Sequence, residues 1–228
     1  HIETITGILK EEKNVVPNGF NLEEDVNLNA PRLYSDSFVL NFINQMSKVG
    51  LTTYAGSVGT SVRSDIKSYY MDCLTETMQL YDKSTELLLS KGLFIRCPSL
   101  PNLEEVQFVK KQWFMLDVFG EKRPLIAAEV ANLFANLQRN AMGVATLTGF
   151  SQVAKDKDVK QFLLKGLEVG NKHIRLFRDK LEESKLPAPM GWDSEITNST
   201  SHTFSDKLMM FFTSGLISLS VGYYGTAV

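Results

Sequence analysis

The sequence has 228 residues, of which 43% are hydrophobic, so it can bury a sizeable core in one large or two small domains. Its 24 Lys and Arg residues nearly balance its 26 Asp and Glu residues, and the formal net charge is -2. This balance lacks the strongly positive field typical of nucleic-acid-binding domains, and we expect no nucleic-acid partner.

The first half of the chain is predicted to form two long helices joined by a short linker. Apolar side chains recur with a 3.6-residue period over residues 35–62, where Ser35 or Asp36 is placed to cap the helix N-terminus. The glycines in this range are Gly50, Gly56 and Gly59. Glycine is costly inside a helix, and close contact with a neighbouring helix is the explanation we favour. The same period continues over residues 64–91, and Gly92 provides a C-terminal stop.

The second half is predicted to contain three more helices after a break in the pattern. Residues 93–123 include several helix-breaking positions and are predicted to be a linker that contains one short helix near residues 104–112. Beyond the linker, the 3.6-residue period indicates helices at residues 125–154, 157–184 and 205–228. All the predicted elements are therefore helical.

The two ends of the chain are similar to each other, which predicts an internal duplication. At an offset of 172 residues the matches are His1-Ile2 with His173-Ile174, Pro17-Asn18-Gly19-Phe20 with Pro189-Met190-Gly191-Trp192, and Glu23 with Glu195. At an offset of 170 residues Tyr34-Ser35-Asp36 matches Phe204-Ser205-Asp206. We infer a period of about 170 residues, with the chain starting late in one copy and stopping within the next.

The lengths of the connections predict how these helices are arranged. A helix of about 28 residues is about 42 Å long, and such helices bury their apolar stripes side by side in an elongated bundle. Short linkers favour antiparallel hairpins, whereas about 20 residues before the last helix allow a long crossover. This order predicts ferritin-like, up-down-down-up four-helix bundles. Residues 1–92 would end one bundle, residues 93–123 would link, and residues 124–228 would begin the second bundle.

Several segments of the chain are similar to those of a known family. They are residues 25–33 (DVNLNAPRL), 61–66 (SVRSDI), 88–92 (LLSKG), 122–125 (KRPL), 149–155 (GFSQVAK) and 204–210 (FSDKLMM). In these segments the chain resembles a Bacillus (Firmicutes) family of unknown function that has duplicated ferritin-like four-helix bundles and some members with a spore-coat label. The resemblance implies this fold and an association with sporulation, and it carries over no catalytic residues.

A ferritin-like fold raises the question of a di-iron site. Such sites need Glu-x-x-His pairs, because residues three apart lie on one face of a helix. The histidines are His1, His173 and His202. Gly170 and Ser199 stand three residues before the last two, so neither completes the motif.

Three residues are the remaining metal-ligand candidates, namely Glu129, Glu168 and His173. Glu168 and His173 are five residues apart, about 140° around a helix, which is poor spacing for one metal ion. Glu129 falls in a first helical turn, where the helix dipole alone favours a carboxylate. His1 and His173 recur at equivalent repeat positions, for which a buried, hydrogen-bonded histidine is the commoner explanation. We therefore predict no metal and no other cofactor.

These observations leave three functional hypotheses. The first is a non-enzymatic structural or interaction protein that binds protein partners or itself, with a link to sporulation. The second is a divergent di-metal carboxylate protein of oxidase or iron-handling type. The third is a bundle that binds a small molecule in a cavity lined by aromatic residues. Its candidate lining residues are Tyr54, Tyr70, Phe134 and Tyr224.

Two features bear on where the protein resides. Residues 208–228 form an uncharged run long enough to cross a membrane, but their repeat counterpart contains Asn41, Asn44, Gln45 and Lys48. A shared fold then favours a buried bundle helix, and we expect no membrane span. Cys73 and Cys97 form no C-x-x-C pair, which favours a reduced, cytoplasmic setting, with spore association as a further hypothesis.

Overall fold

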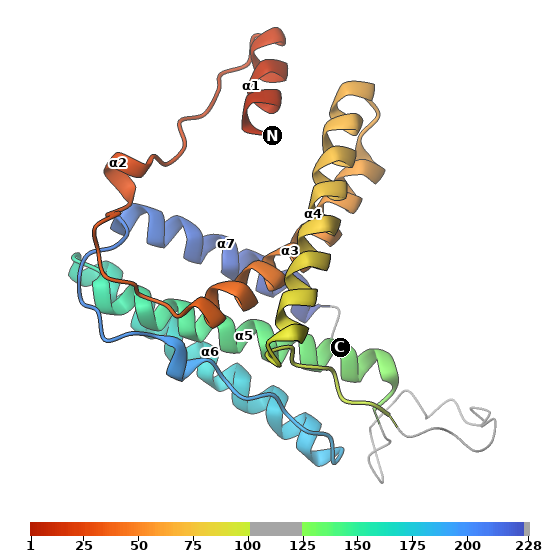
Figure 1. The fold of residues 1–228 in the computed structure, drawn as a ribbon, viewed down its shortest axis with the longest axis vertical. Coiled ribbons are helices and arrows are strands. Elements are labelled where there is room, and N and C mark those ends of the chain that lie inside the picture. The colour runs from red at the N-terminus through yellow and green to blue at the C-terminus, as the bar shows by residue number, and fades with distance from the viewer. Residues whose placement is uncertain (101–124, 226–228) are drawn as a thin grey trace, which may run out of the picture.

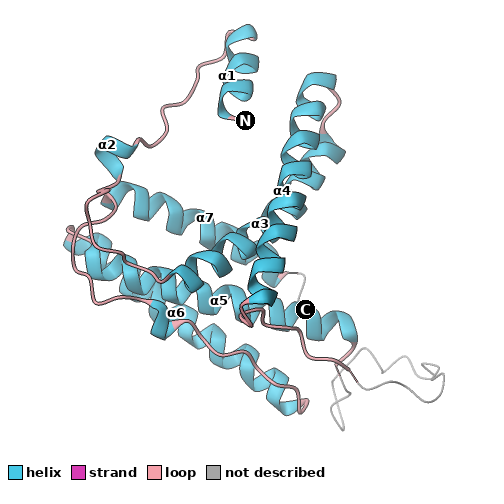
Figure 2. Cartoon of the chain, in the orientation of Figure 1, coloured by secondary structure: helices cyan, strands magenta, loops and turns pink. Residues whose placement is uncertain are grey.

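A computed structural model describes residues 1–100 and 125–225, and every regular element in these ranges is a helix (Figures 1 and 2). The elements are α1 (Ile2–Glu11), α2 (Leu22–Asp25), α3 (Asp36–Thr60), α4 (Ser64–Ser90), α5 (Ala127–Val153), α6 (Lys157–Glu183), the 3₁₀ turn η2 (Asp193–Glu195) and α7 (Asp206–Tyr224). The prediction of an all-α protein is confirmed. No helix of the described ranges combines the length and the apolar character that crossing a bilayer requires.

The helix boundaries follow from local sequence signals. Helices α3 to α6 begin and end within two residues of the predicted bounds. The Ser35 hydroxyl accepts a hydrogen bond from the Phe38 N–H at 3.0 Å and so caps α3. Gly92 follows α4 with a φ of 67°, which lets the Leu93 N–H reach the Leu88 carbonyl at 2.8 Å. The short helix predicted near residues 104–112 lies outside the described residues.

Helices α3 and α4 form the first antiparallel hairpin. Gly50 lies so close to α4 that a Cβ atom there would be 2.9 Å from Cγ2 of Thr77. Further toward the hairpin turn, the rings of Tyr54 and Tyr70 are 6.4 Å apart. The predicted close contact is confirmed at Gly50. It is wrong for the other two glycines of α3, because no described atom would lie within 4 Å of a Cβ there.

Helices α5 and α6 form the second hairpin, again with glycines at the contact. A Cβ at Gly170 would lie 2.7 Å from Cγ2 of Val144, and one at Gly166 would lie 2.9 Å from Cδ1 of Leu147. The residue numbers rise along one helix as they fall along the other, so the pair is antiparallel. Both predicted hairpins are therefore present.

Helix α5 is the centre of the described core, and it packs against α3, α6 and α7. Phe38 of α3 joins Ala141 and Ala145 of α5 in one buried cluster. Leu181 of α6 joins a second cluster with α5, and Met209 of α7 joins a third. All three side chains from the surrounding helices are at most 2% exposed. Burial of this kind stabilises the assembly by about 1.5–3 kcal/mol for each large apolar side chain.

The duplication is visible in the backbone. Adding 172 to the bounds of α1 gives residues 174–183, which are the last turns of α6. Each of these helix ends is followed by a lysine in the left-handed region, Lys13 with a φ of 56° and Lys185 with a φ of 58°. Non-glycine residues seldom adopt this conformation, so its recurrence at the same offset supports a shared structure.

The segments before α3 and α7 exchange equivalent contacts. The Ser35 N–H donates to the Glu195 carbonyl and the Ser205 N–H donates to the Asp25 carbonyl, both at 2.9 Å. In addition, the Glu195 carboxylate accepts a hydrogen bond from the Ser35 hydroxyl, and the Asp25 carboxylate accepts one from the Ser205 hydroxyl. The other exchanged pairs are the bridges Val26–Phe204 and Tyr34–Ile196, and the hydrogen bonds Asn27–Thr203 and Thr197–Leu33. Each contact has an equivalent, obtained by adding 170 to the lower residue number and subtracting 170 from the higher one.

These reciprocal contacts describe a pseudo-two-fold axis between the two repeats. Phe42 and Phe212 are equivalent residues, and their rings lie 5.8 Å apart, as expected of a pair beside the axis. The structure pairs Asp25, rather than Glu23, with Glu195. The two-residue register shift between the repeats therefore falls before Asp25, a few residues earlier than the sequence match suggests.

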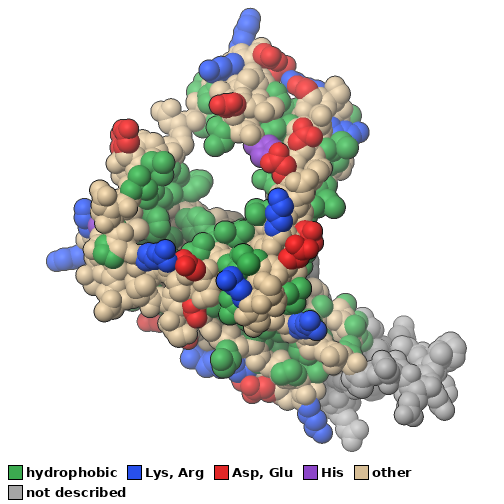
Figure 3. Space-filling model, in the orientation of Figure 1, with side chains coloured by type: hydrophobic (Ala, Val, Ile, Leu, Met, Phe, Trp, Pro, Cys, Tyr) green, Lys and Arg blue, Asp and Glu red, His purple; other side chains and the backbone are tan. Residues whose placement is uncertain are grey.

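Helix α1 lies beside α4, apart from the rest of the molecule (Figure 1). None of its residues is buried. It contacts the α4 region through two ion pairs and one ring contact: His1 Nε2 lies 3.0 Å from Glu76 Oε2, Arg63 lies 2.7 Å from Glu12, and the His1 ring meets the Tyr69 ring edge-on at 5.9 Å. Figure 3 shows an open hollow between this end of the molecule and the remaining helices, with hydrophobic side chains at its rim.

Candidate functional site: an apolar groove between α6 and α7

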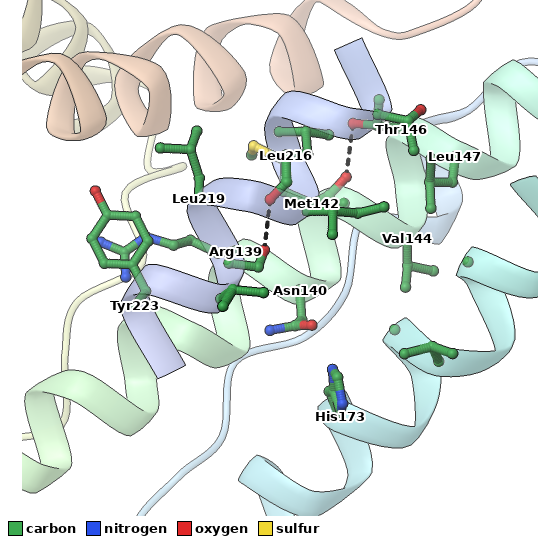
Figure 4. A pocket seen from close by; sticks show the side chains of 18 of the residues that line it. Arg139, Asn140, Met142, Val144, Thr146, Leu147, His173, Leu216, Leu219 and Tyr223 are labelled. Carbon is green, nitrogen blue, oxygen red and sulfur yellow. Dashed lines mark hydrogen bonds between the residues drawn. The ribbon is translucent and has the colours of Figure 1, made fainter. Parts of the chain in front are cut away.

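A cavity of about 370 Å³ lies between α6 and α7, with α5 and part of α3 as its floor (Figure 4). Its walls are mostly apolar. Phe162 and Val169 of α6 and Ile217 and Val221 of α7 line it, and they are 44%, 45%, 48% and 66% exposed. Four large apolar side chains facing one channel form a surface of the kind that binds a partner. We call this channel the α6–α7 groove.

Polar side chains close one end of the groove. The Tyr224 hydroxyl donates to Asn140 Oδ1 at 2.7 Å and lies 3.1 Å from His173 Nδ1. Because the tyrosine proton is directed to Asn140, His173 Nδ1 is the donor in the second contact. Burial raises the pKa of Tyr224, so the hydroxyl stays protonated. His173 is thus half-buried and hydrogen-bonded, and it faces the groove (Figure 4).

Two cations lie beside this polar end. The Arg139 guanidinium stacks on the Tyr223 ring, 3.7 Å from its centroid, and Lys48 of α3 lies close enough to repel it. Burial lowers the pKa of both groups, and their mutual repulsion lowers the pKa of Lys48 further. In the described part of the chain neither cation has a carboxylate partner. The groove therefore has a surplus of positive charge at this end.

The repeat reveals what fills the equivalent place in the other half of the molecule. His173, Tyr224 and Ser220 line the groove, and they are the counterparts of His1, Tyr54 and Gly50. All three counterparts contact α4. The contacts are His1 with Glu76, Tyr54 with Tyr70, and Gly50 with Thr77. Helix α4 thus occupies the site in the first repeat that corresponds to the α6–α7 groove in the second.

The three predicted metal-ligand candidates have separate partners. Glu129 Oε2 accepts a hydrogen bond from the Ile126 N–H at 2.9 Å at the start of α5. Glu168 pairs with Lys165 at 2.6 Å on the surface of α6, whereas His173 contacts Tyr224. Within residues 1–100 and 125–225, no group of three or more His, Cys, Asp or Glu side chains is placed to hold a metal ion.

The four aromatic residues proposed to line a cavity are not brought together. Tyr224 lines the α6–α7 groove, whereas Phe134 belongs to the core and is 6% exposed. Tyr54 and Tyr70 contact each other between α3 and α4.

Sequence reasoning missed the importance of Arg139. The signal was a charged residue inside the apolar pattern of α5, the helix with the broadest buried face. A charged residue at such a position indicates a specific interaction, because burying a charge without a partner is unfavourable. The buried amides of Asn136 and Gln138 on the same helix were missed in the same way.

Comparison with known proteins gives a family and no close relative of known function. The sequence profile of one family, described as "Protein of unknown function (DUF3231)", matches residues 1–106 and again residues 113–228. The two matches agree with the internal duplication. No curated protein matches the chain, and no solved structure matches it.

Proposed function

This chain belongs to the DUF3231 family of unknown function, and we propose that it is a non-enzymatic interaction protein whose α6–α7 groove binds an amphipathic helix. One observation carries the proposal. In the first repeat α4 contacts the counterparts of His173, Tyr224 and Ser220, which all line the groove. A helix like α4 therefore suits the groove, seated slightly farther out at Ser220, whose Cβ takes space that Gly50 leaves free in the first repeat.

The free energy available from apolar burial is adequate for such binding. The four exposed side chains of the groove walls are 44–66% exposed. Covering the exposed half of each would contribute about 1 kcal/mol, so the four together supply about 4 kcal/mol before the partner's own side chains are counted. Ordering the helix offsets part of this gain.

The experiment that tests the proposal supplies the helix within the same chain. Val228 corresponds to Val58 at an offset of 170, so appending a copy of residues 59–91 after Val228 continues the repeat in register. The appended helix is then present at a high effective concentration. We expect the midpoint of thermal unfolding to rise by roughly 6–12 °C, which corresponds to about 3 kcal/mol for a chain of this size. Binding of an apolar dye should fall.

A matched pair of substitutions controls this experiment. Ile217→Arg places a charge in the groove wall and should abolish most of the gain in the midpoint. Val62→Arg changes a side chain that is 96% exposed and lies outside the groove, and it should leave the gain intact. An unchanged midpoint in the extended chain, or an equal effect of the two substitutions, would contradict helix binding.

A second candidate function is binding of an apolar small molecule in the same groove. The observation that favours it is the cavity volume of about 370 Å³, which is within the usual size range of ligand pockets. The two functions are distinguishable, because a small molecule that occupies the groove would be displaced by the appended helix. The arrangement of Glu129, Glu168 and His173 gives no support to a di-metal enzyme.

The wider setting is part of the proposal. The α3–α4 and α5–α6 hairpins support two ferritin-like four-helix bundles, to which residues 1–92 and 124–228 would each contribute a part, with residues 93–123 between them. The resemblance to proteins with a spore-coat label supports a cytoplasmic protein that associates with the forming spore. Immunodetection in fractionated sporulating cells tests this setting, and even distribution between growing cells and spores would contradict it.

A further inference from the structure

The helix that occupies the equivalent site in the first repeat is acidic. Between its bounds α4 carries five acidic and two basic residues, a formal charge of -3. The acidic residues are Asp65, Asp72, Glu76, Asp82 and Glu86. Of these, Glu76 lies 3.0 Å from His1, and His1 is the repeat counterpart of His173 in the groove.

The groove presents the opposite charge. Arg139 and Lys48 lie at its polar end without a carboxylate partner among the described residues, and Arg139 lines the cavity itself. The guanidinium stacks on the Tyr223 ring, and its N–H groups donate in the plane of the guanidinium, parallel to the face that it stacks on. A carboxylate placed there would offset the repulsion between the two cations.

His173 adds a second position for a carboxylate. Its Nδ1 atom forms a hydrogen bond with Tyr224, and among the described residues no hydrogen bond or ion pair reaches its Nε2 atom. In a protonated histidine both ring nitrogens donate hydrogen bonds, so a carboxylate at Nε2 would complete the arrangement that His1 and Glu76 form in the first repeat.

We propose that the α6–α7 groove selects an acidic helix, whose carboxylates pair with Arg139 and with Nε2 of His173. The inference rests on the proposed helix binding and adds the chemistry of the partner. Apolar contacts along the groove walls provide affinity, and the two basic side chains at one end determine which helices bind and in which direction.

Two synthetic peptides test this selectivity against the complete chain. The first is residues 64–90 with blocked ends, and the second is its twin in which the five acidic residues are replaced by the matching amides. Circular dichroism establishes the helix content of each peptide, and calorimetry at low salt gives its affinity. We expect the acidic peptide to bind about tenfold more tightly than its twin. This ratio lies between the effect on affinity of exposed ion pairs and the effect of buried ones.

Substitutions in the protein assign the effect to particular side chains. Arg139→Met keeps the apolar stem and removes the charge, and it should reduce the tenfold preference to about threefold or less. A third peptide differs from the acidic peptide only by Glu76→Gln. His173→Asn should remove the difference in affinity between these two peptides. Lys180→Met is the matched control, because Lys180 is also a basic residue of α6 but lies outside the groove lining and pairs with Glu183 at 3.3 Å. It should leave the preference unchanged within about twofold.

The outcomes separate the two proposals. Equal binding of the acidic peptide and its amide twin would overturn the selection of an acidic helix and leave helix binding standing. Failure of both peptides, together with an unchanged midpoint in the chain extended by residues 59–91, would overturn helix binding and this inference with it. A preference that Arg139→Met and Lys180→Met reduce equally would also overturn the assignment to Arg139.

Discussion

Three glycines on the α5–α6 hairpin provide a graded test of the packing. A Cβ at Gly170 would lie 2.7 Å from Cγ2 of Val144, about 1 Å inside the normal contact distance of two carbon atoms. Val144 is β-branched, helical and 6% exposed, so it has little freedom to move. A Cβ at Gly166 would meet the flexible end of Leu147 at 2.9 Å, and one at Gly143 would meet nothing within 4 Å.

The expected changes in the free energy of unfolding follow from these distances. Alanine in place of glycine inside a helix is favourable by about 1 kcal/mol, which Gly143→Ala should gain in full. At Gly170 this gain is opposed by an overpacking cost of about 1–3 kcal/mol, so Gly170→Ala should be destabilising by about 1 kcal/mol. At Gly166 the two contributions should nearly cancel, because the Leu147 side chain can rotate away.

Thermal unfolding monitored by circular dichroism compares all three variants. For a chain of this size, 1 kcal/mol corresponds to about 2–4 °C in the thermal midpoint, so the order Gly143→Ala, Gly166→Ala, Gly170→Ala should be resolved. Equal stabilisation of the three variants would refute the close approach of α5 and α6 at Gly170.

The reciprocal contacts between the repeats lead to two further predictions. Ser205→Ala removes the cap of α7 and should lower the free energy of unfolding by about 1 kcal/mol. Ser35→Ala should raise the pKa of Glu195 less than Ser205→Ala raises the pKa of Asp25, because Ser37 also donates to the Glu195 carboxylate. Hydrogen bonds from Ser205 and from Ser35 hold the pKa values of Asp25 and Glu195, respectively, below their ordinary values of 3.8 and 4.5. Because the folded pKa values are the lower ones, this stabilisation is complete above about pH 5 and is lost as the pH falls through 4 toward 3. Urea denaturation at pH 6, 4 and 3 should show a shallower loss in Ser205→Ala than in the unaltered chain; the same loss in both would contradict the role of the hydroxyl.

Much of the fold was predictable because its signals are local. The period of the apolar residues, the caps at Ser35 and Ser205, and the stop at Gly92 each depend on a few neighbouring residues, and the helix bounds followed from them. The duplication was also accessible, since equivalent residues are similar enough to align.

The reciprocal contacts between the repeats were not predictable in the same way. The partner of Ser205 is Asp25, 180 residues earlier, and nothing in the local sequence of either residue indicates the other. The sequence match instead aligned Glu23 with Glu195, because similarity alone does not locate a two-residue gap. The groove was missed for a related reason: its walls come from two helices that appear separately as ordinary apolar stripes.

The most direct test of helix binding is a cross-link predicted by the repeat. Gly50 would place its Cβ 2.9 Å from Thr77, and the counterpart of Gly50 in the groove is Ser220. In the chain extended by residues 59–91 and carrying Cys97→Ser, we introduce Ser220→Cys together with Thr77→Cys in the appended copy. We expect a disulfide under mild oxidation, since a Cβ at the Gly50 position lies beside the γ atoms of Thr77, where the introduced sulfur atoms would be. Yields no higher than those of a Ser218→Cys control, which lies outside the groove lining, would contradict it.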